Sequence, residues 1–194
     1  MLSNNHEYGQ AGMPQTVKQL RIKGLFLVQT KIFRDDRGYF IESYKQSEFA
    51  ALGLPEFLQD NFSFSKQGVL RGLHYQLPPF AQGKLIRVLQ GRVWDVAVDI
   101  RKKSETFGQW LGVELSEESG EAFYVPAGFA HGFVVLSDTA RVLYKITAEY
   151  APEAERGIVW NDADLNIAWP VKQPLLASRD AGFPRFKEVE PYDV

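Results

Sequence analysis

Short stretches in which apolar and polar residues alternate follow one another from about residue 25 to residue 150. Turn-forming segments rich in Gly, Ser and Glu separate them at short, regular intervals. A period of two places successive side chains on opposite faces of an extended chain, which is the pattern of a β-strand. Many short strands with little helical periodicity favour an antiparallel sandwich or barrel over a parallel α/β sheet. The sequence therefore predicts an all-β fold.

The alternating pattern also predicts where most of the strands lie. The expected strands span residues 25–33, 38–44, 84–89, 92–100, 109–115, 122–125, 132–136 and 140–147. The clearest hairpin joins the third and fourth of these strands through Gln90-Gly91. In the fourth strand Asp95 and Asp99 fall on the same face, which indicates that this face is wet or lines a polar cavity.

Segments outside the alternating region are expected to lie at the periphery. One short helix is predicted over residues 47–53, with Ser47 as its N-cap and Gly53 as the residue that stops it. Residues 1–18 form a polar tail that we expect to be poorly ordered, and residues 19–194 form a single domain. The Pro- and Asp-rich C-terminal part is expected to wrap this domain as loops and short turns.

Composition narrows the classes of protein and of site. The chain has no cysteine, which excludes disulfides, thiolate metal sites and a cysteine nucleophile. A net charge of −2 gives no indication of a nucleic-acid or membrane-surface partner. No signal-peptide pattern is visible, and no apolar run approaches the roughly 20 residues needed to span a bilayer. We therefore expect a cytoplasmic protein.

Two of the three histidines, His74 and His131, adjoin expected strands and are flanked by glycine and aromatic residues. This setting predicts imidazoles that point into a cavity, and imidazole is well suited to proton transfer near neutral pH. A metal site is the alternative, but Tyr75 and Gln76 follow His74 where a His-x-His pair would be needed. Two separated histidines without cysteines make a poor set of metal ligands, so acid–base chemistry explains them better.

A histidine that acts as a base usually has its second ring nitrogen held by a carboxylate. The pattern does not single out that carboxylate, and Asp95, Asp99, Asp162 and Asp180 all remain open.

Other candidate residues have an ordinary structural explanation when each is taken alone. Lys84 suits a solvated strand edge, and Tyr144 suits the core face of an apolar strand. Arg37 and Arg71 each stand beside a glycine at a strand end, which fits anion binding and surface charge equally well.

Taken together, their order and spacing are similar to those of one family. The matching segments are residues 36–44 (DRGYFIESY), 59–63 (QDNFS), 69–76 (VLRGLHYQ), 82–85 (QGKL), 95–101 (DVAVDIR), 106–110 (TFGQW), 126–134 (PAGFAHGFV) and 143–145 (LYK). These segments resemble the dTDP-4-dehydrorhamnose 3,5-epimerase family, and the resemblance covers roughly residues 20–186.

The resemblance implies a cupin-type jelly-roll barrel, a homodimer, and a reaction that needs neither a metal nor an organic cofactor. The implied reaction inverts C3 and C5 of dTDP-4-dehydro-6-deoxy-D-glucose through enolates and gives dTDP-4-dehydro-L-rhamnose, a step of dTDP-L-rhamnose biosynthesis. Both carbons adjoin the C4 ketone, so the reaction requires a base, a group that stabilises the oxyanion, and an acid on the opposite face.

The resemblance also implies a role for each matching residue. His74 is the expected base with Asp180 as its dyad partner, Lys84 supports the enolate oxygen, and Tyr144 returns the proton. The residues expected to bind the dTDP-sugar are Arg37, Glu42, Gln59, Asn61, Arg71, His131, Glu155 and Arg179.

The chain departs from the family pattern at three places. Arg179 stands where lysine is common, Ala177 stands where serine is often found, and the N-terminal tail is longer than the family core requires. Two alternatives are a related dTDP-sugar enzyme that acts at one carbon or shifts the ketone between C3 and C4, and a non-catalytic sugar-binding cupin. Tyr144 together with His74 and Lys84 favours epimerisation over both.

Overall fold

The computed structural model describes residues 7–8, 15–190 and 192, and it is built almost entirely of β-strands. The strands are β1 (Glu7–Tyr8), β2 (Gln15–Gln19), β3 (Phe26–Thr30), β4 (Ile32–Asp35), β5 (Gly38–Ile41), β6 (Gln59–Lys66), β7 (Leu70–Gln76), β8 (Lys84–Gln90), β9 (Arg92–Asp99), β10 (Trp110–Ser116), β11 (Glu121–Val125), β12 (Phe129–Val135), β13 (Thr139–Ile146) and β14 (Glu155–Gly157). The helical elements are α1 (Gln46–Ala51), α2 (Ser178–Ala181) and the 3₁₀ turns η1 (Pro152–Ala154) and η2 (Phe186–Glu188).

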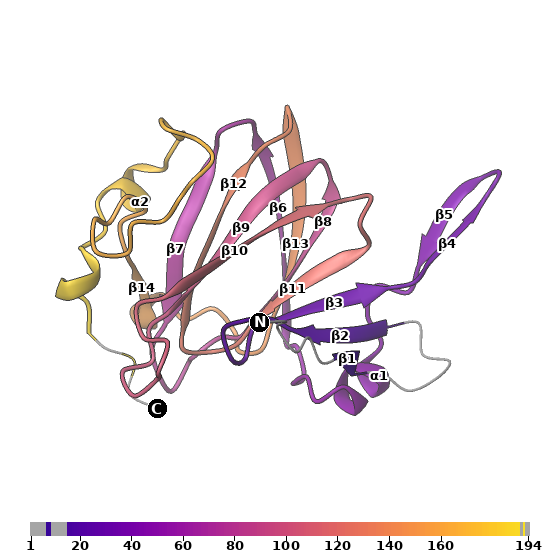
Figure 1. The fold of residues 1–194 in the computed structure, drawn as a ribbon, viewed down its shortest axis with the longest axis horizontal. Helices are drawn as coiled ribbons and strands as arrows, with labels where there is room; N and C mark the ends of the chain where they lie inside the picture. The colour runs from indigo at the N-terminus through magenta and orange to yellow at the C-terminus, as the bar shows by residue number, and fades with distance from the viewer. Residues whose placement is uncertain (1–6, 9–14, 191, 193–194) are drawn as a thin grey trace, which may run out of the picture.

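The strands form two main antiparallel sheets that face each other (Figure 1). The larger sheet has the order β1-β2-β3-β11-β8-β13-β6, and the smaller has the order β10-β9-β12-β7-β14. Consecutive strands mostly lie in different sheets or apart within one sheet, which is the connectivity of a jelly roll. The predicted all-β, antiparallel jelly-roll barrel of the cupin type, with a few short peripheral helices, is confirmed.

The main hydrophobic core lies between the two sheets. It is formed by inward-facing side chains of both, among them Ile86, Phe123, Phe129 and Phe133, each at most 2% exposed. Alternation explains this packing, because every second residue of each strand points into the space between the sheets.

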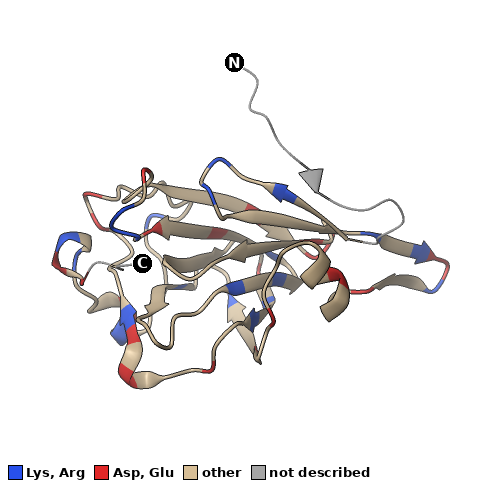
Figure 2. Ribbon diagram, turned by 90° about the horizontal axis from the view of Figure 1, so that it is seen from below, with Lys and Arg blue, Asp and Glu red and all other residues tan. Residues whose placement is uncertain are grey.

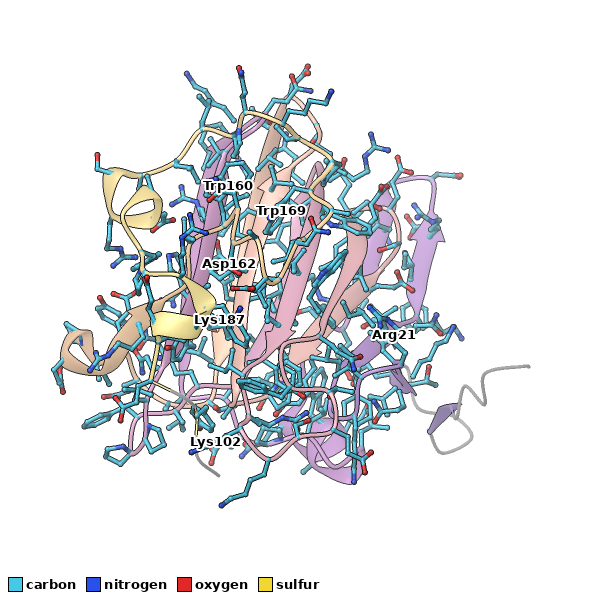
Figure 3. The ribbon with its side chains drawn as sticks, turned by 60° about the vertical axis from the view of Figure 1, so that its left-hand side comes forward. Arg21, Lys102, Trp160, Asp162, Trp169 and Lys187 are labelled. Carbon is cyan, nitrogen blue, oxygen red and sulfur yellow. The ribbon has the colours of Figure 1, made fainter. Side chains whose placement is uncertain are left out.

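Other segments of the chain pack against the outer face of each main sheet. Helix α1 places Phe49 on the outer face of the larger sheet, against Leu85 and Tyr124. The C-terminal segment lies across the outer face of the smaller sheet, as the labelled Trp160 and Trp169 indicate (Figure 3). Figure 3 also labels Asp162, whose carboxylate accepts hydrogen bonds from three backbone N–H groups and so holds this segment folded. The C-terminal wrap expected from the sequence is therefore an ordered layer with a defined position.

The predicted hairpin between residues 84–89 and 92–100 is wrong. Strand β8 pairs with β11 and β13, whereas β9 pairs with β10 and β12 in the other sheet. The Gln90-Gly91 turn therefore carries the chain from one sheet to the other. Gly91 fits this tight crossing because its φ is +80° and because a Cβ there would collide with the Thr139 carbonyl oxygen.

The face that Asp95 and Asp99 share is the inner face of the smaller sheet. Both residues are completely buried, so this face is not wet, and neither residue lines the cavity described below.

The N-cap of helix α1 lies two residues earlier than expected. Lys45, not Ser47, occupies the N-cap position, and no side chain caps the helix there. Gly53 follows the helix with φ +77°, as expected for a residue that stops it.

The tail predicted over residues 1–18 is ordered at its C-terminal end. Residues 15–18 belong to β2, which pairs with β3, and Gln15 and Val17 are buried there. Apolar contact with the α1 side of the sheet explains this order. Residues 7–8 pair with β2 as β1, and residues 1–6 and 9–14 lie outside the described residues.

The β4–β5 hairpin projects away from the two main sheets (Figure 1). Its side chains Phe33, Tyr39 and Phe40 are 44%, 52% and 65% exposed, which is unusual for large rings. Acidic and basic residues are interspersed over the ribbon, including this hairpin (Figure 2). Within the described part of the chain, no helix is long and apolar enough to cross a membrane.

Candidate active site

A cavity of about 340 Å³ opens between the two sheets. Strands β6, β8 and β13 of the larger sheet and β7, β12 and β14 of the smaller sheet supply its walls, and α2 closes one side. The sequence analysis predicted twelve catalytic or substrate-binding residues. Nine of them line this one cavity: Asn61, Arg71, His74, Lys84, His131, Tyr144, Glu155, Arg179 and Asp180. Residues from across the sequence are therefore brought to one site.

The His74 imidazole on β7 is held by Asp180 on α2. His74 Nε2 lies 2.9 Å from Asp180 Oδ1, and the other carboxylate oxygen accepts the Gly72 N–H at 3.1 Å. Burial acts to raise the pKa of Asp180, but the bonds to His74 and Gly72 and the charge of Arg179 together hold it below its ordinary value. The carboxylate thus stays ionised and orients the ring. Because Nε2 is occupied, Nδ1 is the His74 nitrogen left for a proton transfer.

Glycines make the wall beside His74 possible. Strands β7 and β12 approach so closely that a Cβ on Gly72 would lie 2.6 Å from the Gly132 Cα, and one on Gly132 would lie 2.7 Å from the Arg71 carbonyl oxygen. This approach brings His74 and His131 directly opposite each other in the strand register.

Lys84, the first residue of β8, extends into the cavity from the larger sheet. Its ammonium group donates a hydrogen bond to the His74 carbonyl oxygen at 3.0 Å. Burial lowers the pKa of Lys84 to about 8, while Asp95 and Glu155 act in the opposite direction. The cavity therefore contains a cation with two further N–H donors beside the His74 imidazole.

Tyr144 on β13 faces the cavity from the sheet opposite to His74. Its hydroxyl lies 2.5 Å from the Ser63 hydroxyl, and its ring packs 6.1 Å from the Phe133 ring. Burial raises the pKa of Tyr144, so the phenol remains protonated and can act as an acid. Tyr144 and His74 thus present a proton donor and a proton acceptor from opposite walls of one cavity.

Charged and aromatic groups surround the cavity beyond these three residues. Glu155 Oε2 accepts hydrogen bonds from the Tyr150 hydroxyl at 2.8 Å and from Arg179 Nη1 at 2.6 Å. Arg71 Nε donates to the Ser65 hydroxyl at 3.0 Å. Tyr150 is 48% exposed, which leaves its ring available to a planar ligand. The rim therefore combines cations for an anionic ligand with a ring for stacking.

Three nominated residues do not line the cavity of their own chain. Gln59 lies beside it and bonds two lining residues, Asn61 through its amide nitrogen and the Tyr150 N–H through its amide oxygen. Arg37 lies at the tip of the β4–β5 hairpin, where its side chain is 90% exposed and pairs with Asp35. Glu42 follows the same hairpin.

Sequence reasoning missed several residues of the site. Ser63 and Tyr150 line the cavity, and neither was a candidate. Asp95 was a candidate partner for the base, but it holds the His131 ring instead, at 2.8 Å. Ser63 shares the inward face of β6 with Asn61, so strand alternation alone would have nominated it. No local signal separates Tyr150 from the other aromatic residues.

The described residues contain no group of three or more His, Asp or Glu side chains arranged to hold a metal ion. Asp180 and Asp95 each bond one ring nitrogen of His74 and His131, so the pair of imidazoles could offer only two Nδ1 atoms, too few for a protein metal site. We expect dialysis against a strong chelator to leave the catalytic rate unchanged, with addition of Mg²⁺ or Zn²⁺ as the matched control. Loss of activity that one divalent metal restores would contradict this expectation.

Comparisons with known proteins agree with one another. A sequence model of the family described as dTDP-4-dehydrorhamnose 3,5-epimerase matches residues 19–188. The dTDP-4-dehydrorhamnose 3,5-epimerase of Shigella flexneri is 51% identical over 176 residues, which cover 90% of this chain and 97% of the relative. The enzyme of the same description from Pseudomonas aeruginosa is 55% identical over 165 residues, covering 84% of this chain and 91% of the relative.

A solved structure gives the same result. The crystal structure of dTDP-6-deoxy-D-glucose-3,5-epimerase from Legionella pneumophila, in complex with dTDP-4-keto-L-rhamnose, superposes with a TM-score of 0.88 at 45% identity. The match covers 93% of this chain and 98% of that chain.

Proposed function

Because the chain belongs to the dTDP-4-dehydrorhamnose 3,5-epimerase family, we propose that its central cavity binds the dTDP-sugar and that His74, Lys84 and Tyr144 perform the inversion. The protein is an isomerase that inverts C3 and C5 of dTDP-4-dehydro-6-deoxy-D-glucose and gives dTDP-4-dehydro-L-rhamnose, a step of dTDP-L-rhamnose biosynthesis. The observation that carries the proposal is a base and an acid on opposite walls of one cavity.

The proposed steps follow from the geometry. His74 Nδ1 removes the proton from a carbon next to the C4 ketone, and the electron pair of that C–H bond moves to the C4 oxygen as an enolate. The Lys84 ammonium stabilises this oxygen. When the enolate collapses, the Tyr144 hydroxyl delivers a proton to the opposite face of the same carbon, which inverts it. Solvent then returns a proton to Tyr144 and takes one from His74, and the cycle repeats at the second carbon.

Nucleotide binding is proposed for the rim of the cavity. Arg71 and Arg179 supply cations for the diphosphate, and the exposed Tyr150 ring supplies a surface for the base. Asn61 and Glu155 supply polar contacts to the sugar nucleotide, with Gln59 orienting Asn61. Arginine at position 179 preserves the charge of the common lysine and adds a planar fork of donors.

Proton NMR in deuterated water tests the function directly. With dTDP-4-dehydro-6-deoxy-D-glucose as substrate, we expect deuterium to enter at both C3 and C5 and the signals of dTDP-4-dehydro-L-rhamnose to appear. Exchange and inversion at one carbon only would identify a single-carbon epimerase. Migration of the ketone to C3 would identify a 3,4-ketoisomerase, and either result would overturn the proposal.

The role of Lys84 predicts a pH dependence. Only its ammonium form stabilises an enolate, so the active fraction falls as the pH rises through the pKa of about 8. We expect kcat/KM to decrease above that pH. In Lys84→Arg the guanidinium stays protonated, so the decrease should move to higher pH even where the rate is lower. If kcat/KM decreases at the same pH in Lys84→Arg, the decrease is caused by the titration of another group.

We further propose that the active unit is a homodimer in which the β4–β5 hairpin serves the partner. The exposed rings of Phe33 and Phe40 favour burial against a second chain. Arg37 and Glu42 resemble substrate-binding positions of the family, yet they lie outside the cavity of their own chain. A hairpin that reaches the other protomer's cavity reconciles these two observations.

Subunit complementation tests the homodimer. Sedimentation should give twice the monomer mass, and Arg37→Ala should weaken substrate binding. When His74→Ala and Arg37→Ala protomers are mixed and allowed to exchange, the mixed dimer contains one site with both native residues, so activity should return. No recovery despite demonstrated exchange would contradict a role for Arg37 in the partner's site.

A further inference from the structure

A second histidine–aspartate pair lies beside the cavity, and the proposed mechanism does not use its carboxylate. His131 on β12 places its Nε2 atom 2.8 Å from Oδ1 of Asp95 on the neighbouring strand β9. His131 is 4% exposed and Asp95 is not exposed at all. Burying a charged carboxylate costs free energy of folding, so such a residue is normally paired or kept for a function.

One nitrogen of the His131 ring, Nδ1, is available to bind a ligand. The ring lines the cavity, and within the described residues Nδ1 has no hydrogen-bond partner. Asp95 does not line the cavity, and its Oδ2 atom is buried without a partner. The carboxylate therefore acts on a bound ligand only through the His131 imidazole.

The surrounding charges favour one protonation state of the pair. Burial lowers the pKa of His131, with Lys84 and His74 acting in the same direction and Asp95 against them, so the imidazole is neutral. Burial raises the pKa of Asp95 above its ordinary value, and the His131 imidazole and the Lys84 ammonium offset part of this rise. The 2.8 Å contact between His131 Nε2 and Asp95 Oδ1 fits a carboxylate that accepts the ring proton. A carboxylate accepts only, so the single proton of the neutral ring resides on Nε2. Nδ1 then carries a lone pair.

We propose that Asp95 is a positioning residue that keeps the His131 proton on Nε2, so that Nδ1 accepts a hydrogen bond from a hydroxyl group of the bound sugar. The inference rests on the proposed function, because it takes the ligand of the cavity to be a hexose nucleotide. Nδ1 of His131 can only accept a hydrogen bond, so it cannot bind the C4 ketone oxygen, which is also an acceptor. The His131–Asp95 pair therefore binds a hydroxyl group on another ring carbon, and Lys84 binds the ketone oxygen.

Nitrogen NMR reads the tautomer directly. The chain contains only three histidines, so ¹⁵N-histidine labelling gives three rings, and a His74→Asn variant removes one of them. We expect His131 without ligand to show a protonated Nε2 and an unprotonated Nδ1 near neutral pH. An imidazolium, or a proton on Nδ1, would overturn the proposal whatever the variants do.

Asp95→Ala removes the acceptor, so the His131 ring should populate both tautomers and give intermediate ¹⁵N shifts. Asp99→Ala is the matched control, because Asp99 is equally buried on the same strand but bonds Arg101, Ser104 and Thr106 instead. It should leave the His131 signals unchanged. A single Nε2-protonated form that persists in folded Asp95→Ala would contradict the role of Asp95.

Ligand affinity gives a second test of the role of Asp95 that does not depend on catalysis. Asp95→Ala should bind dTDP within twofold of the wild type but bind dTDP-glucose roughly tenfold more weakly, the effect of one lost hydrogen bond in a buried site. The wild type should bind either the 2-deoxy or the 3-deoxy analogue of dTDP-glucose more weakly than dTDP-glucose by a similar factor. Asp95→Ala should bind that analogue and dTDP-glucose with equal affinity. Equal losses for dTDP and dTDP-glucose would make Asp95 a structural residue. A wild type that binds dTDP-glucose but lacks epimerase activity would refute the proposed reaction and leave this inference standing.

Discussion

His74→Ala is expected to abolish turnover while the fold and much of the nucleotide affinity remain. The imidazole lines the cavity from the sheet opposite Tyr144, and Asp180 holds its Nε2 atom so that Nδ1 is left for the substrate. A positioned base contributes roughly 10²- to 10⁴-fold to a proton transfer, and two such transfers depend on this one residue. We do not expect His131 to substitute, because burial lowers its pKa, which makes it a weaker base, and because its Nδ1 is assigned to a sugar hydroxyl.

The measurement combines turnover of dTDP-4-dehydro-6-deoxy-D-glucose with deuterium exchange at C3 and C5, and both should be lost. Thermal unfolding and calorimetric titration with dTDP serve as controls for fold and binding. Asp180→Asn is the informative companion variant, since it keeps the ring but weakens its orientation and should retain more activity than His74→Ala. Residual turnover of His74→Ala within tenfold of the wild type would remove His74 from the role of base.

The fold was predictable because its main signal is local. Alternation with a period of two depends only on neighbouring residues, so most strands could be located without knowledge of their partners. Partner choice is not local, which explains why the hairpin expected through Gln90-Gly91 was wrong. Strand β8 finds its partners in β11 and β13, more than 30 residues further along the chain. A short turn between two strands does not require them to share a sheet.

The site was predictable only in part, for a related reason. His74 and His131 stood out through their glycine and aromatic neighbours, and the structure brings them face to face on β7 and β12. Their carboxylate partners could not be chosen by spacing, because Asp180 is 106 residues from His74 and Asp95 is 36 residues from His131. Asp95 had been open as a partner for the base, but it belongs to the other imidazole. Only the folded chain decides between them, because it pairs β9 with β12 and places α2 beside β7.

Tyr144→Phe should separate proton exchange from inversion. Proton removal by His74 and enolate stabilisation by Lys84 do not involve the phenol, so the variant should still bring deuterium into the substrate. Inversion requires delivery from the opposite wall, where Tyr144 supplies the hydroxyl. Formation of inverted product should therefore fall by roughly 10²- to 10⁴-fold, the contribution of a positioned acid. The phenylalanine ring keeps the packing against Phe133, so the core should tolerate the change.

Tyr124→Phe is the matched control for this experiment. Tyr124 is another tyrosine of the larger sheet, but it packs under α1 and does not line the cavity, so its loss of a hydroxyl should leave both activities intact. Full exchange and full inversion in Tyr144→Phe would show that Tyr144 only fills the core. Loss of both activities in a folded variant would mean that the hydroxyl also organises the base or the enolate, for example through its bond to Ser63. Exchange without inversion is the one outcome that assigns the acid to the wall opposite His74.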